Sequence, residues 1–163
     1  PIGDLREGII EMARNTALKP TDLVLGPEVW NKLQDHPDFL DRIKYTQKGV
    51  VGTDLLAELL GINRVHIAWA IKNTGAEGEA ANYEFHHGKN ALLLYRPASP
   101  GLNTPAAGYT FRWTGLFGSG ENGIRIKKFR MEQIASDRIE AEEALDMKVV
   151  SADLGYFYSG CVS

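Results

Sequence analysis

The sequence from 22 to 43 constrains the fold most strongly, because a strand pattern runs directly into a helix pattern. The apolar run Leu23 to Leu25 predicts a short strand, and Gly26-Pro27 follows at once. Proline suits the first turn of a helix, where no backbone N–H donor is needed. Pro37 is expected to break this helix. The residues predicted to face the core from the two helical pieces are apolar: Val29, Trp30, Leu33, Phe39, Leu40 and Ile43.

Two further helices are predicted, one on each side of this segment. Asp4 followed by Glu7 has the spacing of a capping box, and the helical pattern continues until Lys19-Pro20. Thr53 is expected to cap a later helix, and Gly61 to end it in the left-handed conformation that glycine favours. Their predicted apolar faces consist of Leu5, Ile9, Met12, Ala13, Leu55, Leu56, Leu59 and Leu60.

The apolar spacing then changes to two, which predicts strands. Val65, Ile67 and Trp69 share one face of the first strand. Residues 72–90 are rich in Gly, Ala, Asn and Glu, have no period, and predict a long mobile loop. Residues 91–95 are apolar on both faces and predict a central strand. The chain is therefore predicted to be α+β.

Alternating patterns continue toward the C-terminus. Tyr109, Phe111 and Trp113 alternate with polar residues, and we expect them to face the core of a sheet. Residues 124–131 alternate isoleucine with arginine and lysine, as in a strand with one solvated or paired face. Residues 138–158 are expected to return antiparallel, although EAEEALDM within them has strong helical propensity.

Two charged runs are expected to meet through this antiparallel return. It would place Glu140 and Glu142 near Lys127 and Arg130. Complementary surfaces, within the chain or between subunits, account for these runs better than paired catalytic carboxylates or a phosphate site. The first helix is further expected to bury Leu5 and Ile9 against the last strands, near Val149 and Phe157.

Composition excludes several classes of protein. The chain has 163 residues, 18 of them basic and 21 acidic, and its net charge of −3 does not favour direct binding of a polyanion. The single cysteine, Cys161, excludes an internal disulfide and a cysteine-rich metal site. The longest apolar run is five residues, Ala91 to Tyr95, whereas a membrane helix needs about 20, so no membrane association is predicted.

No catalytic, cofactor or metal site is predicted. Gly118 to Gly123 matches the dinucleotide pattern G-x-G-x-x-G, but the pattern leads into a strand instead of a helix, and nucleotide binding is rejected. The sequence contains no G-x-S-x-G elbow, and Cys161 has no histidine near it in sequence. The histidines also lack the spacing of zinc ligands: His36, His66, His86 and His87.

The order of these segments resembles the major capsid proteins of tailed double-stranded DNA bacteriophages and prophages, which have the Hong Kong 97-type fold. In that family a peripheral helix leads into an axial domain through a strand, a Gly-Pro turn and a tryptophan-bearing helix, and closing strands return. The similar segments here are 8–18, 23–45, 52–74, 88–113 and 137–162.

The resemblance implies a peripheral-domain helix at 1–22, an axial domain at 23–119 and returning peripheral strands at 120–163. The arm, extended loop and spine helix that precede these parts in the family are not in this sequence, so a C-terminal portion is implied. The implied function is structural and not enzymatic. Copies would form pentamers and hexamers of an icosahedral virion shell that encloses DNA without reading its sequence, assembled in the bacterial cytoplasm.

The candidate partners are other copies of the subunit and scaffolding, portal or decoration proteins. An encapsulin-like nanocompartment shell is the near alternative, and a small cytosolic enzyme with a histidine and carboxylate site is the alternative from another class. A cleft that joins two histidines with a strongly perturbed carboxylate would favour the enzyme. The candidate subunit-contact residues are Glu77, Glu79, Tyr83, His86, His87, Arg125, Lys127, Lys128, Glu140 and Glu142.

Overall fold

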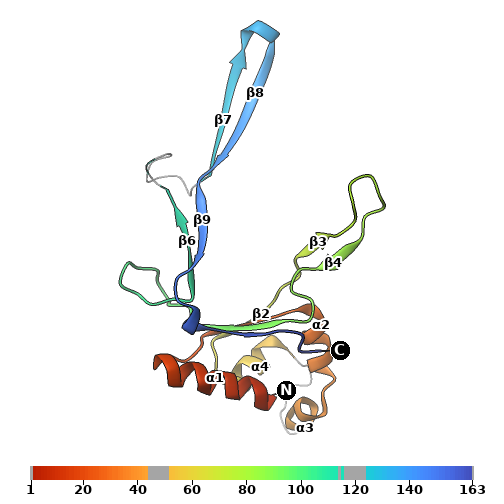
Figure 1. The fold of residues 1–163 in the computed structure, drawn as a ribbon, viewed down its shortest axis with the longest axis vertical. Helices are drawn as coiled ribbons and strands as arrows, with labels where there is room; N and C mark the ends of the chain where they lie inside the picture. Colours follow the sequence, from red (N-terminus) through yellow and green to blue (C-terminus); the bar gives the residue numbers. More distant parts are fainter. Residues whose placement is uncertain (1, 44–51, 114, 116–123, 163) are drawn as a thin grey trace. The chain divides into compact units, whose positions relative to one another are not determined.

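The computed structural model describes residues 2–43, 52–113, 115 and 124–162. It contains two compact units, the larger formed by Pro1–Ala107 with Ser151–Ser163 and the smaller by Gly108–Val150. Both helices and strands are present (Figure 1), which confirms the predicted α+β class. The division into axial and peripheral domains remains a prediction.

The elements of each unit follow the order of the chain. The larger unit contains α1 (Ile2–Thr16), β1 (Asp22–Leu25), α2 (Pro27–Gln34), α3 (Pro37–Ile43), α4 (Thr53–Leu60), β2 (Arg64–Ile67), β3 (Ile71–Asn73), β4 (Tyr83–Phe85), β5 (Ala91–Leu94), η2 (Ala152–Leu154) and β10 (Gly155–Tyr158). The smaller unit contains β6 (Gly108–Arg112), β7 (Ile124–Met131), η1 (Glu132–Ile134), β8 (Ser136–Glu143) and β9 (Leu145–Val149).

The larger unit is organised around a four-stranded sheet with the order β10-β5-β1-β2. Strand β1 runs parallel to β2 and antiparallel to β5, and β5 is also antiparallel to β10. The prediction of a central strand at 91–95 is therefore confirmed. Because β10 follows β5 by some 60 positions in the chain, this sheet joins segments that are distant in sequence.

The helices of this unit gather on one face of the sheet (Figure 1). On that face Leu23 lies directly opposite Leu93, and both side chains are 0% exposed. Each fully buried leucine contributes about 2 kcal/mol of transfer free energy. The predicted core residues of α2 are all buried, and so is Phe39 of α3, whereas Leu40 is 41% exposed. The helix pattern therefore identified most of this core.

The helix boundaries correct two details of the prediction. Helix α1 begins at Ile2, so Asp4 lies inside its first turn, where a carboxylate interacts favourably with the helix dipole. Gly52 and not Thr53 occupies the N-cap of α4, without a side-chain hydrogen bond. Gly61 ends α4 at φ 64°, as predicted. No helix in the described ranges is long and apolar enough to cross a membrane.

Helix α1 packs against β10, but the strand residues of this contact differ from those predicted. Leu5 and Ile9 are buried, as expected. Phe157, however, is 56% exposed, and Val149 belongs to the smaller unit. Alternation along a strand places Tyr156 and Tyr158 on the helix side of β10 and Phe157 on the other side. The hydroxyl of Tyr158 donates a hydrogen bond to the Asp4 carbonyl oxygen at 3.0 Å.

The close approach of α1 and β10 predicts opposite effects for two glycine substitutions in one helix. A Cβ at Gly8 would overlap the Tyr158 hydroxyl, whereas a Cβ at Gly3 would have no atom within 4 Å. Gly8→Ala should therefore lower the free energy of unfolding by about 1–3 kcal/mol. Gly3→Ala should raise it by up to about 1 kcal/mol, because alanine favours the helix. Urea denaturation measures both, and a stabilising Gly8→Ala would contradict this packing.

Candidate subunit-contact surfaces

Strands β7 and β8 form an antiparallel ladder from Ile124↔Glu143 to Met131↔Ser136. The predicted return as strand is confirmed, against the helical propensity of the sequence. Lys127 lies opposite Glu140, as expected. Arg130 instead lies opposite Asp137 in the same register, with Nη1 to Oδ1 at 3.3 Å, and is therefore not the partner of Glu140 or Glu142 in this ladder.

One face of this hairpin is a network of ion pairs. Glu142 accepts hydrogen bonds from Arg125 Nη2 at 2.7 Å and from Lys127 Nζ at 2.6 Å, one on each carboxylate oxygen. The hydrogen bond from Lys127, followed by that from Arg125, lowers the pKa of Glu142 below its ordinary value. Arg138 Nη2 lies 2.8 Å from Glu140 Oε1 on the same face. The predicted pairing of the basic run with the acidic run therefore occurs largely within the chain.

The opposite face of the β7–β8 hairpin exposes three isoleucines. Ile126 is 72% exposed, Ile139 is 68% exposed and Ile124 is 52% exposed. Lys128, a predicted contact residue, lies on this face and pairs with Asp137 at 3.2 Å. Large exposed apolar patches rimmed by polar groups mark sites of protein contact.

The segment 72–90 is not the unstructured loop that was predicted. It forms most of a hairpin in which Ile71 lies opposite Phe85 and Asn73 lies opposite Tyr83. The Asn73 side-chain oxygen accepts hydrogen bonds from the backbone of Gly75 and Asn82, which orders the turn. Strands of three residues are too short to produce a recognisable period, so composition alone suggested a loop.

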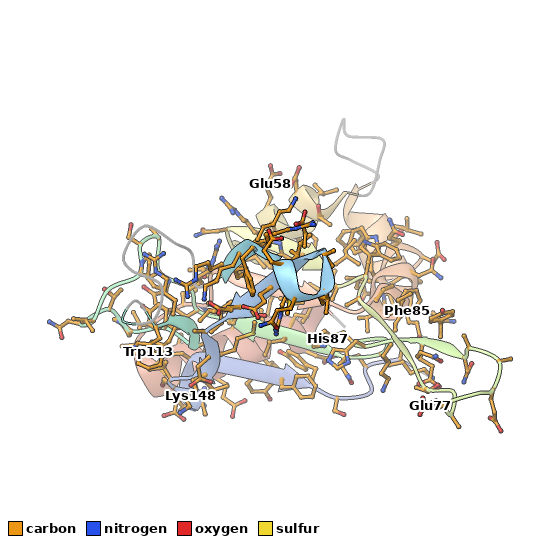
Figure 2. All side chains as sticks on the ribbon, turned by 90° about the horizontal axis from the view of Figure 1, so that it is seen from above. Glu58, Glu77, Phe85, His87, Trp113 and Lys148 are labelled. Atoms are coloured by element: carbon orange, nitrogen blue, oxygen red, sulfur yellow. The ribbon has the colours of Figure 1, made fainter. Side chains whose placement is uncertain are left out.

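The β3–β4 hairpin also carries exposed apolar side chains. Trp69 is 62% exposed, Ile71 is 60% exposed and Tyr83 is 65% exposed. Trp69 follows the end of β2 instead of continuing it, and its ring meets Phe85 edge to face at 6.1 Å. Figure 2 shows the Phe85 side chain projecting from this hairpin.

The structure places the other predicted contact residues of this segment on and beside the hairpin. Glu77, labelled in Figure 2, and Glu79 are exposed in the turn. The rings of His86 and His87 lie 5.4 Å apart. Both histidines line an open hollow of about 580 Å³ together with Glu28, Tyr83 and Glu84. Whether these residues contact another subunit remains a prediction.

Strands β6 and β9 form a two-stranded sheet, and this corrects the prediction of an aromatic core. Phe111 is 49% exposed and Trp113 is 66% exposed. The alternation was identified correctly, but the described residues provide no second layer over the aromatic face of this sheet. Met147 and Val149, which alternate along β9, are 76% and 77% exposed on the other face.

A charged network lies at the beginning of β1. The Asp22 side chain is 4% exposed, with Oδ1 at 3.1 Å from His66 Nε2 and 3.3 Å from Arg96 Nη2. Thr21 donates a hydrogen bond to Asp22 Oδ2 at 2.7 Å. Burial would raise the pKa of Asp22, but the hydrogen bonds from Thr21 and His66 and the charge of Arg96 together lower it. No sequence pattern marks this network, since His66 and Arg96 lie far from Asp22 in sequence.

The remaining candidate sites do not assemble a reaction centre in the described part of the chain. His36 and Cys161 line one cavity of about 500 Å³, but burial raises the pKa of the Cys161 thiol, which disfavours the nucleophilic thiolate. No group of three or more His, Cys, Asp or Glu residues in the described ranges could hold a metal ion. The glycine pattern at 118–123 lies outside the described residues.

The sequence analysis identified the alternation along β6 and β7 but did not select their apolar faces as candidate contacts. It chose charged residues as candidate contacts, and several of these are satisfied within the chain, as in the pairing of Glu142 with Lys127. The useful signal was the alternation itself. Ile124 and Ile126 share one strand face with Lys128, whereas Arg125 and Lys127 share the other.

Comparison with known proteins finds relatives among phages. The chain is 25% identical to the major capsid protein of Burkholderia phage BcepMu, over 98% of this chain and 50% of that protein. It is 26% identical to the major capsid protein of Pseudomonas phage JBD67, over 95% of this chain and 50% of that protein. The chain thus spans about half the length of the curated relatives it matches. The predicted similarity to phage major capsid proteins is confirmed.

A solved structure shares the fold. A phage-related protein from Bordetella bronchiseptica superposes with a TM-score of 0.83 and 19% sequence identity, over 99% of this chain and 51% of that one. No family model matches the chain.

The Asp22 network predicts a dependence of stability on pH. Since the pKa of Asp22 is lower in the folded state, its stabilising contribution is present above about pH 4 and is lost as the pH falls through the folded pKa. Asp22→Asn should lower the free energy of unfolding at pH 7 by about 1–2 kcal/mol and flatten its acid dependence. Urea denaturation at pH 7 and pH 3 measures this.

Asp38→Asn is the matched control, because Asp38 is 58% exposed and pairs only loosely with His36 at 3.7 Å. It should change the free energy of unfolding by less than about 0.5 kcal/mol. Equal effects of the two substitutions would contradict the role assigned to Asp22.

The ion pairs of Glu142 predict a measurable titration. Replacing Arg125 and Lys127 by methionine should raise the pKa of Glu142 toward the ordinary value for glutamate, because both hydrogen bonds to its carboxylate are lost. Carboxyl-carbon NMR measures the titration. Lys128→Met, which removes a cation from the opposite face, should leave it unchanged. If Lys128→Met raised the pKa of Glu142 as much as the double substitution does, the hydrogen bonds from Arg125 and Lys127 would not be the cause of the lowered pKa.

Proposed function

We propose that this chain is a portion of the major capsid protein of a tailed double-stranded DNA phage or prophage. Copies of the complete polypeptide would assemble into a closed icosahedral shell that encloses the packaged DNA. The observation that carries the proposal is the similarity to two phage major capsid proteins over at least 95% of this chain. The role is structural, as it is for these relatives, and the chain would belong to the virion.

The proposed architecture is of the Hong Kong 97 type. The order of segments in the sequence supports it, together with the mixed α+β fold and its likeness to a phage-related protein. In this proposal residues 1–22 and 120–163 belong to a peripheral domain, residues 23–119 belong to an axial domain, and the chain is the C-terminal portion of its subunit. Scaffolding, portal or decoration proteins would be further partners.

The exposed surfaces of the structure fit this role. A closed shell requires each subunit to contact several others through different surfaces. The sheets β3–β4, β6–β9 and β7–β8 each have two strands and expose large apolar side chains, among them Trp69, Trp113 and Ile126. Isolated two-stranded hairpins are only marginally stable in water. Contacts with other subunits would cover these side chains.

The alternatives have less support. Both phage relatives are named for a capsid role, which does not favour an encapsulin-like compartment. An enzyme would be favoured by a cleft with two histidines and a strongly perturbed carboxylate. Asp22, whose pKa is lowered, lies beside His66, whereas His86 and His87 line a different hollow.

The complete polypeptide encoded by the reading frame that contains this sequence should assemble when purified. We expect negative-stain microscopy to show rings or closed shells, and light scattering to show their growth with protein concentration. Analysis of nucleic acid and protein in shells isolated from cells would then separate a DNA container from a cargo compartment. A small monodisperse species at every concentration would contradict the proposal.

A further inference from the structure

The apolar face of the β7–β8 hairpin has an ordered distribution of charge and size. Residues directly opposite one another in an antiparallel pair share a face. On this face β7 contributes two isoleucines and two cations, and β8 contributes two carboxylates, one alanine and one isoleucine. The rungs from base to tip are Ile124↔Glu143, Ile126↔Ala141, Lys128↔Ile139 and Arg130↔Asp137. The charged residues of β7 on this face are thus all basic and those of β8 all acidic.

We propose that this face packs against the same face of a second copy, across a two-fold axis parallel to the strands. The inference rests on the proposed function, because it assigns one of the contacts between shell subunits. The rotation lays β7 of one copy over β8 of the other at the same height. Ile126 then meets Ala141 of the second copy, and Arg130 meets Asp137 of the second copy.

Charge and size both select this arrangement. It opposes a basic strand to an acidic strand, and the large Ile126 side chain to the small Ala141 side chain. A two-fold axis that is perpendicular to the strands but parallel to the plane of the sheet would instead lay β8 of one copy on β8 of the other. That arrangement opposes Glu143 to Asp137 of the second copy, and like charges at close range are unfavourable. Of these two two-fold arrangements, only the one with its axis parallel to the strands avoids opposing like charges.

The area of the contact determines when it should form. Eight residues of strand at about 3.3 Å each, and two strands of about 5 Å, give a face of roughly 260 Å² per copy. A stable protein interface buries about 800 Å² per partner. This contact is too small to hold two free subunits together. In a shell the other contacts raise the effective concentration of the two faces, so the contact should form only there.

Cross-linking of mixed subunits tests the arrangement. Ile126→Cys and Ala141→Cys are placed in separate copies of the complete polypeptide, with Cys161 and any other cysteine replaced by serine. Facing sheets lie about 10 Å apart, which is too far for a disulfide, so a short bismaleimide is used. Shells assembled from both copies should give a cross-linked dimer in at least about fivefold higher yield than mixed shells that carry the control pair on the opposite face of the hairpin.

The matched control uses the opposite face of the same hairpin. Lys127→Cys and Glu140→Cys lie on adjacent strands at similar heights, and their mixed shells should give no dimer above background. Shells that form normally but show no preference for the Ile126 and Ala141 pair would overturn the inference and leave the proposed function intact. Failure of the unsubstituted polypeptide to form shells would instead overturn the proposed function, and the inference with it.

A second pair of variants tests the charge arrangement without cross-linking. Ile139 would lie over Lys128 of the second copy. Ile139→Lys should therefore raise the subunit concentration required for assembly by roughly tenfold, whereas Ile139→Glu should change it less than threefold. Urea denaturation of the unassembled subunits separates this effect from a change in folding. If Ile139→Lys and Ile139→Glu impaired assembly equally, that would contradict the placement of β7 of one copy over β8 of the other.

Discussion

The pairing of β5 with both β1 and β10 is the interaction on which the larger unit depends. It brings strands from near both ends of the described chain into one sheet. Leu23 and Leu93 lie opposite each other on the face that α1, α2 and α4 cover, and both are fully buried. Tyr156 and Tyr158 of β10 complete this face against α1. Strand β5 contributes the buried Ala91 and Leu93 to the apolar surface that the helices share.

The two-stranded sheets lack such a core. In the β7–β8 hairpin the ion pairs of Glu142 occupy one face and exposed isoleucines occupy the other. In the β3–β4 hairpin the aromatic ring of Trp69 rests on Phe85 and remains largely exposed. This uneven distribution of apolar burial fits a subunit that completes part of its packing in an assembly. The alternation along each strand thus produces an exposed apolar face that the proposed shell would cover.

The sequence predicted the fold well where the apolar residues kept one spacing over at least two turns of helix or over a whole strand. Val29, Trp30 and Leu33 are buried as expected, and 91–95 is central. Periodicity reports which side chains share a face but not what covers that face, so Phe111 was wrongly assigned to a core. Composition failed at 72–90, where Asn73 orders a turn between very short strands. The Asp22 network depends on residues 44 and 74 positions away, which no local pattern reveals.

Hydrogen exchange tests the central claim that the larger unit has a buried core of its own while the β7–β8 hairpin is completed by other subunits. The complete polypeptide is compared before and after assembly, and protection is read by mass spectrometry. Peptides from β1 and β5 should exchange slowly in both states, since their hydrogen bonds lie in a buried sheet. Peptides from β7 and β8 should exchange quickly in free subunits and slowly in shells. Equal protection of β7 and β8 in both states would contradict the account.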